Sequence, residues 1–184
     1  MLWEVLNRML RKIRSLVSNS DYFGIYDNAL SKKECEILIN QFEKSPQTPG
    51  VVYTKGDVEP TVHRNEKSSI ELNGTKFSDH SVISRIILPR LTQCIVKYKK
   101  KYNMLDYTAQ WRYWDHYNVQ KYETEEDGFK IWHTEHGPDD LSSRRIMAWM
   151  FYLNDAKSGT EFMHFPTINA KRGRLVIWPA AWTH

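Results

Sequence analysis

The chain has 184 residues, with 26 Lys and Arg against 22 Asp and Glu, so its formal net charge is +4 at pH 7. Hydrophobic residues make up 41% of the chain and aromatic residues 13%, which excludes a disordered chain and predicts a single sizeable core. The modest positive charge does not demand nucleic acid, and we expect no nucleic-acid partner.

The first residues read as a basic amphipathic helix, which we treat as a separate N-terminal unit over residues 1–20. Apolar side chains recur at helical spacing from Met1 to Val17, with Arg and Lys between them. These charges exclude a signal peptide, and no apolar run in the chain is long enough to cross a bilayer. The helix can dock on an anionic membrane surface or in a partner's groove, but we favour a helix that covers one flank of the domain at 21–184.

A short strand and a helix are predicted at the start of that domain. Tyr22–Tyr26 has the composition of a strand, and Ser31–Glu34 is a capping box, whose side chains satisfy free amides at a helix start. The helix should end before Pro46. Cys35 lies on its apolar face, where we expect a packed thiol. With Cys94 it is one of only two cysteines, which excludes a disulfide framework and favours a reducing, cytoplasmic location.

The next part of the chain contains a loop-rich region and a second helix. Residues 45–77 are rich in Thr, Gly, Pro, Lys and Asn, and we interpret them as irregular strands and loops that can contribute to a substrate rim. A helix is then expected to begin near Ser78 and to pack apolar side chains inward. Pro89 should kink this helix or split it in two.

From Ala109 onward the pattern changes to short strands separated by turns. Arg145–Leu153 is apolar on both faces, which predicts a central strand buried on both sides. Two helices followed by about seven short strands predict an α+β fold that is mostly β, with helices flanking a jelly-roll barrel. The other strands are expected at Ala109–Trp114, Tyr117–Tyr122, Phe129–His133, Thr160–Phe165 and Leu175–Trp178.

The stretch Ile131–Gly137 carries a candidate metal site. Alternate side chains of an extended strand share a face, so His133 and Glu135 are expected to point the same way. A third ligand would have to come from a distant strand that is adjacent in the sheet, and His184 is the best candidate because a buried strand precedes it. Two His and one carboxylate, with other positions open, suit a non-heme Fe(II) oxygenase. The alternative is a solvated surface pair, because a lone His-x-Glu is a weak signal.

With these residues in view, the chain from about Phe23 to His184 resembles the prolyl 4-hydroxylase-like branch of the 2-oxoglutarate- and Fe(II)-dependent oxygenases. That resemblance implies a double-stranded β-helix, a cupin-like barrel, with the metal near one open end. Order and spacing agree across Gln120–Tyr122, His133-x-Glu135, Tyr152–Asp155, Ser158–Phe162, Lys171–Leu175 and Trp182–His184.

The resemblance implies that His133, Glu135 and His184 hold Fe(II) and that 2-oxoglutarate, O2 and ascorbate serve the reaction. Succinate and CO2 would be released while a C–H bond is hydroxylated, in a prolyl residue of a peptide or protein or in a small-molecule substrate. A non-catalytic jelly-roll binding module is the alternative from another class, because a fold does not determine a function.

Roles for the co-substrate pocket also follow from the resemblance. Tyr122 and Tyr152 match tyrosines that hydrogen-bond the carboxylates of 2-oxoglutarate, and Thr160 matches a residue that lines the pocket. For each tyrosine, core packing with a satisfied hydroxyl is the alternative. The loosest candidates for the substrate face, for each of which we favour sheet packing or surface exposure instead, are Trp111, Arg112, Tyr113 and His116.

Three departures from the family pattern stand out. Glu135 replaces the usual Asp, and Ser158 takes the place of a turn Gly. The family continues after the third ligand with a strand whose Arg or Lys pairs with the distal carboxylate of 2-oxoglutarate, whereas this sequence ends at His184. We therefore expect that a C-terminal strand is missing. The basic residues that could substitute are Arg144, Arg145 and Arg174.

Overall fold

The structure is a computed structural model that describes residues 22–52, 59–108, 110–137 and 139–184. The helix predicted over Met1–Val17 lies outside these residues. Within them are two α-helices, α2 (Lys32–Lys44) and α3 (Val82–Lys101). The strands are β1 (Gly24–Tyr26), β2 (Thr48–Pro49), β3 (Lys67–Ser68), β4 (Ile70–Lys76), β5 (His116–Lys121), β6 (Gly128–Phe129), β7 (Met147–Phe151), β8 (Gly159–Phe162), β9 (Phe165–Asn169) and β10 (Leu175–Pro179).

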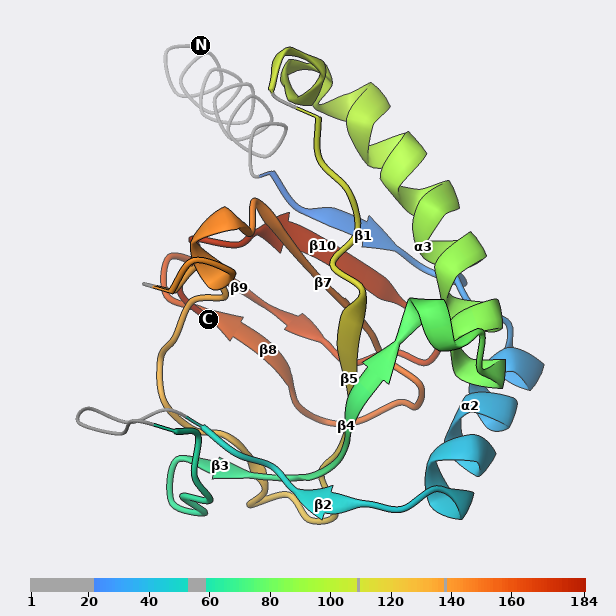
Figure 1. Cartoon of the computed structure of the whole chain (residues 1–184), viewed down its shortest axis with the longest axis vertical. Coiled ribbons are helices and arrows are strands. Elements are labelled where there is room, and N and C mark those ends of the chain that lie inside the picture. Colours follow the sequence, from blue (N-terminus) through green and yellow to red (C-terminus); the bar gives the residue numbers. More distant parts are fainter. Residues whose placement is uncertain (1–21, 53–58, 109, 138) are drawn as a thin grey trace, which may run out of the picture.

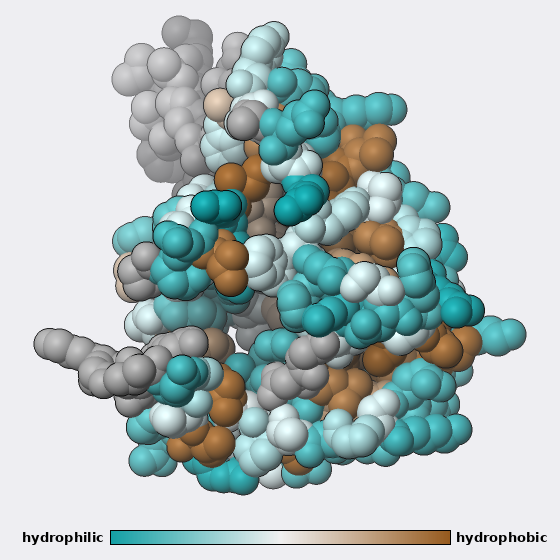
Figure 2. Space-filling view, viewed as in Figure 1, coloured by the Kyte–Doolittle hydropathy of each residue, from teal (hydrophilic) through white to brown (hydrophobic). Residues whose placement is uncertain are grey.

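The fold is α+β and mostly sheet, as predicted, with both helices along one flank of the strands (Figure 1). All strand pairs are antiparallel, and they form sheets of order β1-β10-β7, β2-β4-β5, β3-β6 and β8-β9. Among the described residues, hydrogen bonds therefore join the strands into four sheets and not into one closed barrel. Hydrophilic residues cover most of the face seen in Figure 2, with smaller apolar areas between them.

Helix α2 begins as its sequence predicts, whereas α3 begins at Val82, because the residues near Ser78 form a separate 3-10 turn at Phe77–Asp79. At the start of α2 the Ser31 hydroxyl accepts from the Glu34 amide at 3.2 Å, and the Ser31 amide donates to the Glu34 carboxylate at 2.7 Å. Pro89 does not split α3, which is one element of 20 residues. Proline has no N–H, so the carbonyl of Arg85, four residues before Pro89, lacks its helical hydrogen bond. Both residues are exposed, so that carbonyl can bond to water.

Strand β10 separates two hydrophobic clusters. Successive side chains of a strand point to opposite faces, so Leu175 and Ile177 join the cluster under the helices while Val176 and Trp178 join the other. The cluster under the helices also contains Cys35 and Cys94, both free and buried, and burial raises the pKa of each thiol. Within the part of the chain that the structure describes, no helix is both long and apolar enough to cross a membrane.

The strand predictions need four corrections. The strand expected at Thr160–Phe165 ends at Phe162, because a turn at residues 163–164 leads into β9, which begins at Phe165. Residues 110–114 form no strand, because their aromatic side chains pack on α3: the Tyr113 hydroxyl donates to Thr92, and the Lys99 ammonium lies over the Trp111 ring. The strand expected at Phe129–His133 ends at Phe129. Strand β10, and not β7, is central in its sheet, because β7 pairs on one side only.

Candidate metal centre

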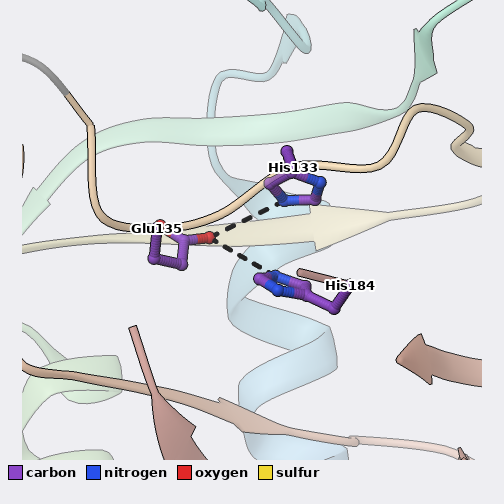
Figure 3. Close-up of side chains that lie close together, drawn as sticks. All are labelled: His133, Glu135 and His184. Atoms are coloured by element: carbon purple, nitrogen blue, oxygen red, sulfur yellow. Dashed lines mark ion pairs between the residues drawn. The ribbon is translucent and has the colours of Figure 1, made fainter. Parts of the chain in front are cut away.

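Two histidines and a carboxylate from distant parts of the chain meet at one point. His133 and Glu135 lie in the loop after β6, and His184 follows the turn after β10. In Figure 3 the three side chains point toward one another. The Glu135 Oε1 atom is 3.9 Å from His133 Nε2 and 3.9 Å from His184 Nε2, and all three ligand atoms lie within 4.8 Å of one another. The structure therefore brings together the three residues that the sequence analysis proposed as metal ligands.

Backbone hydrogen bonds between the two segments hold this arrangement. The amides and carbonyls of His133 and His184 bond to each other in both directions, each at 3.0 Å. The Glu135 amide donates to the carbonyl of Ala180, also at 3.0 Å. The ligand segment is thus an extended loop paired with the chain after β10. It keeps the alternation that places His133 and Glu135 on the same side, although it is not a strand.

Both imidazoles are oriented by backbone carbonyls. His133 Nδ1 lies 3.1 Å from the carbonyl of Ile131, and His184 Nδ1 lies 2.9 Å from the carbonyl of Trp182. Because a carbonyl only accepts, each Nδ1 carries a proton, so in the neutral form of each ring the lone pair is on Nε2, which faces Glu135. This is the tautomer that a metal ion requires of both rings.

The surroundings of His133 favour its neutral form. Burial lowers its pKa, and the neighbouring His184 lowers it further, although the hydrogen bond to Ile131 opposes both effects. The Phe129 ring stacks on the His133 ring at a centroid distance of 3.8 Å, and Trp178 packs edge-on against His184 at 5.0 Å. A neutral imidazole is the form that binds a metal, so the burial favours binding.

The second carboxylate oxygen of Glu135 has a partner of its own. Arg145 Nη1 donates to Glu135 Oε2 at 2.9 Å and approaches the Glu135 carbonyl at 3.3 Å. Of the three arginines considered for the distal carboxylate, Arg145 is therefore engaged with Glu135. Arg174 instead pairs with Asp27 at 2.6 Å, and Arg144 is exposed.

The three residues fit a metal ion. Neighbouring ligands about 2.1 Å from an ion lie about 3.0–3.4 Å apart at octahedral or tetrahedral angles. Both distances from Glu135 are 3.9 Å and all three donor atoms lie within 4.8 Å of one another, so small side-chain rotations would close the triad around an ion. Two nitrogens and one carboxylate oxygen suit non-heme Fe(II), and they also suit Zn(II). The Glu135 side chain is 36% exposed, so solvent and small ligands can reach the centre.

The residues expected in the co-substrate pocket are partly brought together. The Tyr152 hydroxyl lies 2.6 Å from Thr160 Oγ1, and burial raises its pKa although the Thr160 bond opposes this. Tyr122 donates to Gln120 at 3.1 Å. As a whole residue Tyr122 is 43% exposed, yet burial of its phenol end, with repulsion from Glu71 and Tyr152, raises its pKa to about 12.

The sequence analysis missed a buried ion pair beside the triad. Lys67 Nζ lies 2.6 Å from Glu71 Oε1, the two side chains are 6% and 1% exposed, and Ser69 also donates to that oxygen. The same ammonium lies 5.2 Å from the centroid of the Phe129 ring, which stacks on His133. Glu71 Oε2 is buried with no hydrogen-bond partner among the described residues. The signal that could have revealed this pair is the i, i+2, i+4 spacing of Lys67, Ser69 and Glu71, which puts all three side chains on one face of an extended chain.

Comparisons with known proteins add no relative to this picture. No protein-family model matches the chain, and no curated protein matches it.

Proposed function

We propose that this chain is a 2-oxoglutarate- and Fe(II)-dependent dioxygenase that hydroxylates a C–H bond. The observation that carries the proposal is the convergence of His133, Glu135 and His184, with both Nε2 atoms and one carboxylate oxygen facing a common point. Two His and one carboxylate on one side of an ion leave its other positions open, as non-heme Fe(II) oxygenases require. The resemblance to the prolyl 4-hydroxylase-like branch favours a prolyl residue of a peptide or protein as substrate.

The bound iron would supply the activation of O2, coupled to oxidative decarboxylation of 2-oxoglutarate to succinate and CO2. The residues of the chain would bind the iron, hold its ligands in orientation and exclude water. His133 and His184 present their Nε2 atoms in orientations held by the carbonyls of Ile131 and Trp182. The Phe129 ring covers one face of His133, and Trp178 packs edge-on against His184, which limits the access of water to both imidazoles.

Further parts of the proposal concern the co-substrate and the fold. Tyr152 and Thr160 are proposed to contact 2-oxoglutarate with hydroxyls that now bond to each other. Tyr122 is proposed as a second contact, through a hydroxyl that stays protonated at neutral pH and can donate. We also propose that the four sheets belong to a double-stranded β-helix. The two free, buried thiols are compatible with a cytoplasmic setting.

Anaerobic addition of Fe(II) and then 2-oxoglutarate tests the proposal. We expect a visible charge-transfer band for the wild-type chain and its loss in the Glu135→Ala and His133→Ala variants. His164→Ala is the matched control, because His164 is exposed and lies outside the triad, and it should keep the band. A folded wild-type chain that gives no band and binds no iron would contradict the proposal and favour the non-catalytic binding module.

A further inference from the structure

The two oxygens of the Glu135 carboxylate have different neighbours. Oε1 lies at equal distance, 3.9 Å, from the Nε2 atoms of both histidines. Oε2 accepts a charge-assisted hydrogen bond from Arg145 Nη1 at 2.9 Å. One oxygen is therefore turned toward the metal position, and the other is held by a guanidinium.

Arg145 is itself held by the backbone around it. Its amide donates to the carbonyl of Ser142 at 3.1 Å, and its own carbonyl lies 3.2 Å from His136 Nδ1. Its guanidinium also approaches the carbonyl of Glu135 at 3.3 Å. The residue stands two positions before β7, at the edge of the β1-β10-β7 sheet. The guanidinium is thus attached to a supported backbone and is only 38% exposed.

The length of the Glu135 side chain makes this contact important. Glu has one methylene more than Asp, so its carboxylate has an additional rotatable bond and can turn both oxygens toward an ion. A bidentate carboxylate would take two coordination positions and a monodentate one takes a single position. With two histidines already bound, a six-coordinate ion keeps three open positions only if the carboxylate is monodentate. Chelation by 2-oxoglutarate uses two of them, and O2 needs the third.

We propose that Arg145 is a positioning residue that keeps Glu135 a monodentate ligand by occupying its Oε2 atom. The inference rests on the proposed metal site and goes beyond it, because it makes Arg145 the residue that determines how many coordination positions of the ion stay open. It also accounts for how a Glu can serve where an Asp is usual. Arg145 acts through Glu135 and does not contact the ion.

Co(II), which has d–d bands that report coordination number, is the probe for this inference. The wild type, Arg145→Met and Arg85→Met are loaded with Co(II) alone and then titrated with 2-oxoglutarate. Arg85 is the matched control, because it is an exposed arginine on α3, outside the triad and not among the arginines considered for the distal carboxylate. We expect Arg145→Met to retain Co(II), to show an altered d–d spectrum, and to bind 2-oxoglutarate about 10–100-fold more weakly, the range by which loss of an outer-shell partner lowers metal affinity or activity. Arg85→Met should match the wild type, and Arg145→Lys should recover part of the affinity.

The outcomes separate the inference from the proposed function. A folded wild type that fails to bind Co(II) would contradict the metal site itself. A wild type that binds Co(II), beside an Arg145→Met variant with the same spectrum and the same affinity for 2-oxoglutarate, would overturn the role of Arg145 alone. If Arg145→Met does not fold, Arg145→Gln replaces it, because this side chain stays polar but loses the charge and the guanidinium donors. The same spectral change and loss of affinity are expected of it, and an unchanged spectrum would overturn the inference.

Discussion

The buried pair of Lys67 and Glu71 allows a quantitative test of the interior beside the triad. The two groups are 2.6 Å apart, and their side chains are 6% and 1% exposed. At an effective dielectric constant of about 20, unit charges at this distance attract by about 6 kcal/mol, most of which offsets the lost hydration of two ions. Lys67→Met would leave Glu71 with only the Ser69 hydroxyl as a donor. We therefore expect it to lower the free energy of unfolding by about 3–5 kcal/mol.

Urea denaturation of four variants measures this effect. The midpoint and slope give the free energy of unfolding, and a double-mutant cycle of Lys67→Met with Glu71→Leu isolates the coupling between the two sites. The double variant should be more stable than Lys67→Met, because no uncompensated charge remains buried. The control is Lys157→Met. Lys157 pairs with Glu125 at 2.8 Å, but the side chains are 88% and 77% exposed, so the loss should be below about 1 kcal/mol. Equal losses for Lys67→Met and Lys157→Met would refute the argument from burial.

Two further predictions concern the turn that leads into β10. Hydrogen bonds from Arg174 and then Lys171 lower the pKa of Asp27 to about 2, so this carboxylate stabilises the fold above pH 3.8 and the contribution is lost as the pH falls through about 2. Asp27→Asn should lower the free energy of unfolding at pH 7 by no more than about 1 kcal/mol, seen as a lower melting temperature. The difference in stability from the wild type should shrink toward pH 2. A difference that stays constant with pH would contradict the assignment. Gly173 has a φ of +78°, and a Cβ there would lie 2.3 Å from the Leu30 carbonyl, so Gly173→Ala should cost more than about 1 kcal/mol in thermal unfolding. Gly128→Ala is the control, because its Cβ would meet nothing within 4 Å, and a similar loss there would argue against the steric explanation.

Several features of the fold could be predicted because their causes are local. The capping box of Ser31 and Glu34 needs only the first turn of α2, and the alternation along β10 needs only the geometry of an extended chain. Strand propensity alone gave a wrong prediction at residues 110–114, where aromatic side chains pack on a helix and no neighbouring strand is present to pair with them. Propensity reports that a segment suits a half-buried sheet, but hydrogen bonding decides whether a neighbouring strand exists.

The same division holds for the candidate site. The sequence by itself determined that His133 and Glu135 lie on one side of the chain, because residues two apart in an extended backbone share a face, even in a loop. Only the tertiary structure decided that His184 meets them, since backbone hydrogen bonds between its segment and theirs place the two side by side. The tertiary structure alone also revealed that Arg145 donates a hydrogen bond to the second carboxylate oxygen of Glu135. Contacts of this kind depend on how separate segments pack, and the spacing of residues within one segment carries no information about them.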